Sequence, residues 1–190
     1  MTSVKSIRTY TNSFACLFVS LAVLASASDA MAATDGTLGA TSTGTININA
    51  SVANRVRITG LTDVSFLNQD AGTAASNAQD ICVWSNTATK GYSISATGNG
   101  TAGAFTLATT GGLSVDYSVQ WEDISGVSTG TSLTAGAAAA GYTSSATHQS
   151  CSVGPISSAS LIVGLDTTAL SSMQAGVTYT GVLTLLVSPE

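Results

Sequence analysis

Apolar and polar residues alternate along residues 43–52, which read TGTININASV. The apolar positions of this run are Ile46, Ile48, Ala50 and Val52. Because successive side chains of a β-strand point to opposite faces, the pattern predicts a strand with one buried face. The run follows a leader rich in Gly, Thr and Ser. The pattern leaves open whether the strand fills the core of its own domain or that of a neighbouring molecule.

Similar short runs recur along the chain and are separated by Gly, Asn, Ser and Thr. The predicted strands lie at 55–60, 63–67, 80–85, 92–98, 104–109, 113–121, 158–165 and 178–187. Residues 135–150 predict a loop or one helical turn, and residues 168–176 a loop or a short helix. About eight to ten short strands with such turns predict an all-β sandwich or barrel.

The first 32 residues predict a secretory signal peptide. Two basic residues precede an apolar stretch over residues 14–25, and Ala30-Met31-Ala32 fits the small-x-small pattern of a cleavage site. Its removal would leave 158 of the 190 residues, enough for one domain with a hydrophobic core. We therefore expect a signal peptide at 1–32, a leader with a candidate donor strand at 33–54, and a β-sandwich domain at 55–190.

The chain after residue 32 is acidic and carries few charges. It has three basic and nine acidic residues, and charged residues make up only 8% of the whole sequence. A chain without a basic patch is a poor partner for nucleic acid or for an anionic membrane surface. Its many hydroxyl-bearing residues are typical of a secreted β-protein, and its hydrophobic content is too high for a disordered chain.

Two cysteines follow the predicted cleavage site, Cys82 and Cys151. In an exported protein such a pair predicts a structural disulfide. Closing a loop of about 70 residues stabilises the fold by about 4 kcal/mol in the chain-entropy model. A reactive thiol pair or a metal site is the less favoured alternative, because the chain after residue 32 has a single histidine, His148, and no further cysteine to act as a ligand.

No arrangement of residues indicates catalysis. His148 lies in a loop rich in Ser and Thr. The run GVSTG at 126–130 has the spacing G-x-S-x-G, but it lies in a segment with loop chemistry and not at the strand-to-helix turn that a nucleophile motif requires. Glu122 and Asp123 are adjacent, so in a strand they would point to opposite faces and could not act as a pair. We therefore expect a protein that is not an enzyme, with no catalytic residues, no metal site and no cofactor.

Four aromatic residues allow two interpretations: Trp84, Tyr92, Tyr117 and Trp121. They could form a platform on which a sugar ring stacks. They could also fill the core, which is the usual place for aromatic residues that alternate along a strand.

The two ends of the chain carry runs with a recognisable form. Residues 46–52 read I-N-I-N-A-S-V, residues 175–187 read A-G-V-T-Y-T-G-V-L-T-L-L-V, and residues 117–121 read Y-S-V-Q-W. The first run matches I-x-V-x-A-S-V, and the second is similar to A-G-x-Y-[ST]-G-x-[VL]-x-L-x-V with one extra residue before the tyrosine. In these runs the chain resembles the subunits of chaperone–usher pili, especially alpha-type fimbrial subunits and related spore-coat-like secreted pilins.

The resemblance implies an immunoglobulin-like sandwich that lacks its last strand and leaves an apolar groove. The N-terminal segment of a neighbouring subunit fills that groove by β-strand addition. It implies that the donor-strand residues are Ile46, Ile48, Ala50 and Val52, and that the acceptor-groove residues are Leu183, Leu185 and Val187. It further implies a cell-adhesion fimbrium at the cell surface, a homo-polymer of identical subunits, and partners in a periplasmic chaperone and an outer-membrane usher.

Two other functions remain open at this point. The chain could be a self-contained secreted β-sandwich, a surface or carbohydrate-binding module in which residues 43–52 form the first strand of its own core. It could also be a small outer-membrane β-barrel. The low aromatic content of 6%, the lack of a C-terminal aromatic residue and the predicted disulfide argue against the barrel.

Overall fold

The computed structural model describes residues 32–190, which belong to two units. The first unit ends at Ser51, and the second runs from Val52 to Glu190. The predicted signal peptide lies outside the described residues except for Ala32. We refer to residues 32–52, which are the described part of the first unit together with Val52, as the arm.

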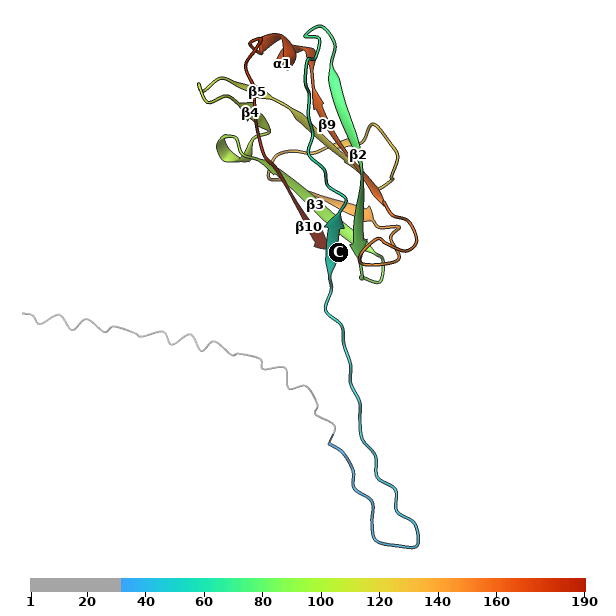
Figure 1. The fold of residues 1–190 in the computed structure, drawn as a ribbon. Coiled ribbons are helices and arrows are strands. Elements are labelled where there is room, and N and C mark those ends of the chain that lie inside the picture. Colours follow the sequence, from blue (N-terminus) through green and yellow to red (C-terminus); the bar gives the residue numbers. More distant parts are fainter. Residues whose placement is uncertain (1–31) are drawn as a thin grey trace, which may run out of the picture. The chain divides into compact units, whose positions relative to one another are not determined.

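The second unit is an all-β fold of antiparallel sheets (Figure 1). Its strands are β1 (Val56–Thr59), β2 (Ala75–Ser85), β3 (Gly91–Gly98), β4 (Thr106–Ala108), β5 (Ser114–Asp116), β6 (Ser118–Glu122), β7 (Thr131–Ser132), β8 (Ala138–Thr143), β9 (Ala159–Leu165) and β10 (Leu183–Pro189). A 3-10 turn (Thr101–Gly103) and one helix, α1 (Thr167–Ser172), complete it. Within residues 32–190, no helix is long and apolar enough to cross a membrane.

Two of the sheets pack face to face and enclose the core. The five-stranded sheet has the order β1-β2-β9-β6-β7, the three-stranded sheet the order β10-β3-β8, and β4 pairs with β5 in a small third sheet. Buried side chains from β2, β6 and β9 meet those of β3 in one apolar cluster. The predicted β-sandwich is thereby confirmed.

An aromatic pair links the two sheets at the centre of the core. Tyr92 and Trp121 are fully buried and meet edge to face, with ring centroids 6.5 Å apart. The indole Nε1 of Trp121 donates a hydrogen bond of 3.2 Å to the Tyr92 hydroxyl, which satisfies both polar groups inside the core. Burial raises the pKa of the Tyr92 hydroxyl above its usual value. With Tyr117 also buried, these residues cannot form a sugar-stacking platform together with Trp84.

The predicted strand at 63–67 is wrong. Strand β1 ends at Thr59, and the next residue, Gly60, adopts a φ of 89°, which interrupts the extended backbone beside β2. The backbone of Thr62 then bonds to the side-chain amide of Gln79, at 3.0 Å from its N–H and 2.8 Å to its carbonyl. Residues 63–67 run without a strand partner, although two of them, Val64 and Phe66, pack half-buried on the core.

Two more predictions from the pattern were wrong. The run 113–121 is not one strand: β5 pairs with β4, whereas β6 belongs to the five-stranded sheet. The chain changes sheets at Tyr117, whose N–H bonds to the carbonyl of Phe105 at 2.9 Å. Residues 135–150 are not a loop or helical turn throughout, because Ala138–Thr143 form β8 and pair with β3.

The predicted disulfide between Cys82 and Cys151 is present. Their Cα atoms lie 6.3 Å apart, within the usual range for a disulfide, and 69 positions separate them in the chain. Together with Ala146 and the half-buried Trp84, the pair forms a second small apolar cluster. The disulfide thus ties the loop between β8 and β9 to β2.

Candidate functional site: the arm and an open sheet edge

The arm turns back on itself and does not form the predicted strand. Thr34 and Thr45 exchange two backbone hydrogen bonds of 2.9 Å in a single antiparallel bridge. Glycine suits this close approach, because a Cβ at Gly36 would lie 2.0 Å from Ser42 Oγ and one at Gly44 would lie 3.1 Å from the Thr34 carbonyl oxygen. One bridge does not make a ladder, so residues 46–51 are extended but are not assigned to a strand.

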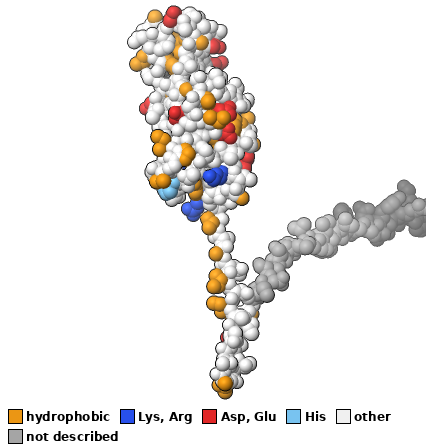
Figure 2. Space-filling model, turned by 90° about the vertical axis from the view of Figure 1, so that its right-hand side faces the viewer, with side chains coloured by type: hydrophobic (Ala, Val, Ile, Leu, Met, Phe, Trp, Pro, Cys, Tyr) orange, Lys and Arg blue, Asp and Glu red, His pale blue; other side chains and the backbone are white. Residues whose placement is uncertain are grey.

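The apolar side chains at the predicted donor positions are exposed. Ile46 is 74% exposed, and Ile48 and Val52 are each 83% exposed; Ala50 is exposed as well. Hydrophobic side chains follow one another along the arm (Figure 2). Such a series of exposed apolar groups is unfavourable in water and indicates a surface that becomes buried on binding.

Strand β10, which holds the predicted acceptor residues, lies at the edge of its sheet. It pairs with β3 alone among the described strands. The N–H of Glu190 bonds to the carbonyl of Gly91 at 3.1 Å, which fixes the hydrogen-bonded positions of this antiparallel ladder. Because these positions alternate, Leu183, Leu185 and Val187 direct their N–H and C=O groups away from β3.

The side chains of these three residues face the core, where they are half-buried. The residues between them are exposed, and Leu186 retains 62% of its accessible surface. The next outward backbone position is Pro189, which has no N–H to donate, and proline is confined to such edge positions within sheets. Strand β10 therefore combines outward backbone groups with incompletely covered apolar side chains.

The sequence pattern gave no indication that β1 forms a second edge. This strand pairs with β2 alone among the described strands, and the bond of 3.1 Å from the Asn86 N–H to the Arg55 carbonyl sets its register. Val56 and Ile58 therefore direct their backbone groups away from β2, and their side chains lie half-buried on the core. Only the register of the ladder shows which backbone groups of β1 point outward, because the sequence V-R-I-T predicts a strand but does not indicate its neighbours.

The two edges lie close together. Cα atoms of β1 and β10 approach within 8 Å of each other. Two strands that flank a third one are about 9.6 Å apart, twice the spacing of neighbouring strands. A strand that paired with both edges would therefore have to push β1 and β10 apart.

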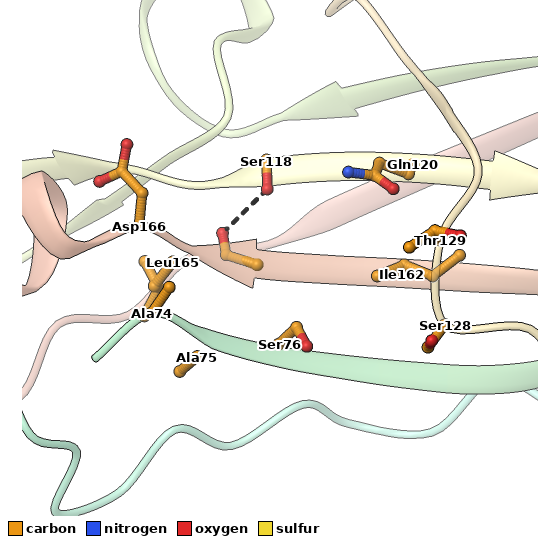
Figure 3. Close-up of a pocket in the computed structure, with 11 residues that line it drawn as sticks. Ala74, Ala75, Ser76, Ser118, Gln120, Ser128, Thr129, Ile162, Leu165 and Asp166 are labelled. Atoms are coloured by element: carbon orange, nitrogen blue, oxygen red, sulfur yellow. Dashed lines mark hydrogen bonds between the residues drawn. The ribbon is translucent and has the colours of Figure 1, made fainter.

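A shallow depression lies on the outer face of the five-stranded sheet (Figure 3). It measures about 210 Å³ and is lined mainly by small hydroxyl-bearing and apolar side chains. Gln120 Oε1 accepts a bond of 3.0 Å from the Gly130 N–H, and Asp166 accepts one of 2.7 Å from the Ala169 N–H. Both polar side chains are thus held by backbone N–H groups of neighbouring segments.

The single histidine lies in an exposed loop. His148 Nδ1 is 2.7 Å from Ser150 Oγ, which in turn is 2.7 Å from Ser152 Oγ. No carboxylate bonds to this imidazole among the described residues. The part of the chain that the structure describes also contains no group of three His, Cys, Asp or Glu residues that could hold a metal ion.

The arm and the open edge are therefore the features with the clearest capacity for binding, and that binding would use backbone pairing and apolar burial. No protein-family model matches the chain, and no characterised protein shows significant sequence similarity to it.

Proposed function

We propose that the protein is a structural subunit of a cell-surface fimbria that polymerises head-to-tail by β-strand addition. One observation carries the proposal. Along β10, Leu183, Leu185 and Val187 combine outward backbone groups with half-buried side chains, and the same chain carries an arm whose exposed apolar residues recur at the matching period of two.

The arm of one subunit pairs with β10 of the next. Its backbone bonds to the outward groups of β10, and Ile46, Ile48, Ala50 and Val52 extend the apolar core of the acceptor. Full burial of an isoleucine or valine side chain contributes about 1.5–3 kcal/mol. Each backbone hydrogen bond adds about 0.5–1.5 kcal/mol net, and the ladder fixes the register.

Each subunit offers one arm and one acceptor strand, β10. Such a head-to-tail contact does not close on itself, so it produces a filament. Before assembly, an exposed edge beside exposed apolar side chains would promote aggregation. We therefore propose a periplasmic chaperone that covers β10, an outer-membrane usher, and export through the periplasm to the cell surface.

Full insertion requires a change in the acceptor. Because Cα atoms of β1 and β10 lie within 8 Å, β1 has to move outward to reach the spacing of about 9.6 Å that an inserted strand needs. The outward backbone groups of Val56 and Ile58 then become the second partner of the arm. We expect this widening to slow the insertion step.

The test is to disable the arm without touching the sandwich. We expect I46D/I48D, in the chain that begins at Ala33, to remain monomeric because two carboxylates cannot enter an apolar edge. The matched control N49D/S51D places the same charges at the polar positions of the arm and should still polymerise. Polymer would be measured by size-exclusion chromatography, and by ladders that persist in SDS without boiling. Filaments formed by I46D/I48D would refute the proposal.

A further inference from the structure

The basic residues of the described chain lie together at one end of the second unit. They are Arg55, Arg57 and Lys90, and none of them forms an ion pair within residues 32–190. The side chain of Asn86 joins the two segments that carry them, because it donates to the Ala53 carbonyl at 3.0 Å and accepts from the Arg55 N–H at 2.6 Å. Figure 2 shows the blue side chains at the lower end of this unit.

Two carboxylates share this end of the unit. Asp123 accepts a bond of 2.8 Å from the N–H of Thr143, which pairs with Gly91, the residue after Lys90. Glu190 also lies beside Gly91. The end thus has mixed charge, although neither arginine bonds to an acid.

The opposite end carries carboxylates only. Asp70 lies in the loop before β2, Asp166 caps α1, and Asp116 ends β5; all three are exposed. These elements are neighbours, because Ser171 Oγ of α1 donates to the Ala71 carbonyl at 3.2 Å and α1 lies within 8 Å of β5. The 11 residues of β2 separate this acidic end from the basic one by about 33 Å.

We propose that the acidic end of one copy receives Arg55 and Arg57 of the next copy in the filament. This inference rests on the proposed function, because the arm brings the two copies together. Arg55 follows Val52 by three residues, which span about 10 Å at most. The arginines therefore lie next to whichever end of the acceptor the arm reaches with its last residue.

The direction of the arm relative to β10 decides which end of the acceptor the arginines reach. This strand begins on the side of α1 and finishes beside Gly91. An arm antiparallel to β10 ends at Asp70, Asp116 and Asp166, whereas a parallel arm would bring the arginines next to Lys90. Charge complementarity thus favours the antiparallel direction, and it adds a contact between globular units to the contact made by the arm.

Peptides that represent the donor can test this contact. The acceptor is the I46D/I48D chain, whose own arm is disabled. The probes are a labelled peptide of residues 43–59, the same peptide with Arg55→Gln and Arg57→Gln, and a peptide of residues 43–53 that ends before both arginines. The affinity of each is measured by fluorescence anisotropy at low and high salt.

Two exposed ion pairs predict a modest difference that depends on salt. In about 20 mM salt we expect the arginine peptide to bind about fivefold more tightly than the glutamine peptide. In about 500 mM salt the two should bind equally, because screening then acts within a few ångströms. The acceptor variant D70N/D116N/D166N should abolish the difference at low salt. Asparagine retains the capping bonds of Asp70 and Asp166, so the fold is preserved.

The outcomes separate this inference from the proposed function. If none of the three peptides binds, the proposed function is wrong. If all bind and the arginine and glutamine peptides have equal affinity at low salt, the function stands and the charged contact is overturned. A preference for arginine that persists on D70N/D116N/D166N would also overturn it, because the arginines would then bind elsewhere.

Discussion

The arm and β10 both carry apolar side chains at every second position, and they differ in what lies behind those side chains. Leu183, Leu185 and Val187 rest half-buried on a core that spans two sheets. Ile46 and Ile48 belong to neither core cluster and are 74% and 83% exposed. The same spacing of apolar side chains thus occurs once with a core behind it and once without.

Their backbones differ in the same way. Strand β10 has a full ladder with β3 on one side, which fixes its register over seven residues. The arm has one bridge, at Thr34 and Thr45, and an isolated two-stranded hairpin is marginally stable in water. A segment therefore forms a regular strand where a neighbouring strand pairs with it, and alternation of its side chains alone is not sufficient.

The largest expected loss of stability comes from a substitution in the core between the two sheets. Trp121→Ala should lower the free energy of unfolding by about 3–5 kcal/mol, because it empties a fully buried site and leaves the Tyr92 hydroxyl without its donor. Urea denaturation followed by circular dichroism measures the loss. A loss below about 1 kcal/mol would show that the core between the sheets is not the source of stability.

Removal of the disulfide should cause the next largest loss of stability. C82A/C151A should lower the free energy of unfolding by about 4 kcal/mol, because a closed loop with a separation of 69 positions restricts the unfolded chain. Denaturation of the double variant gives the value, and reduction of the unaltered protein should reproduce it. If the reduced protein were as stable as the oxidised one, the crosslink would not contribute to the sandwich.

Much of the sandwich could be predicted from the sequence because its central strands are locally distinctive. Tyr92, Ile94 and Ala96 alternate inward along β3, and the apolar run SLIVGL fits a strand buried on both faces, as β9 is. The disulfide was equally predictable, since the two cysteines that follow the predicted cleavage site allow only one intramolecular pairing.

The strand predictions are wrong where pairing with a segment that is distant in sequence determines the structure. Residues 63–67 have strand-like alternation but no ladder, because the positive φ of Gly60 interrupts the extended backbone before them. Residues 138–143 are mostly alanine and glycine and have no alternation to detect, yet β3 supplies a partner for β8. The alternation and the resemblance indicate the arm and β10. Only the register of β1 shows that Val56 and Ile58 lie on a second edge.

A smaller effect should separate the two faces of β10. Leu185→Ala removes a half-buried side chain and should lower the stability of the monomer by about 1–2 kcal/mol. Leu186→Ala, its exposed neighbour, should change it by less than about 0.5 kcal/mol. Both values come from urea denaturation. On addition of the peptide of residues 43–53 the gap should widen, because the bound arm completes the burial of Leu185; an unchanged gap would place the peptide elsewhere.

Substitutions in the arm should have the smallest effect on the stability of the monomer and the greatest effect on assembly. I46A/I48A should leave the free energy of unfolding of the monomer within about 0.5 kcal/mol of the unaltered chain, since both side chains are mostly exposed. The same variant should slow or abolish the growth of filaments, because it removes the apolar surface that an acceptor would bury. Denaturation of the monomer and light scattering during growth measure the two quantities on one preparation. A marked loss of monomer stability would instead assign the arm to its own core, and would return residues 43–52 to the role of an ordinary first strand.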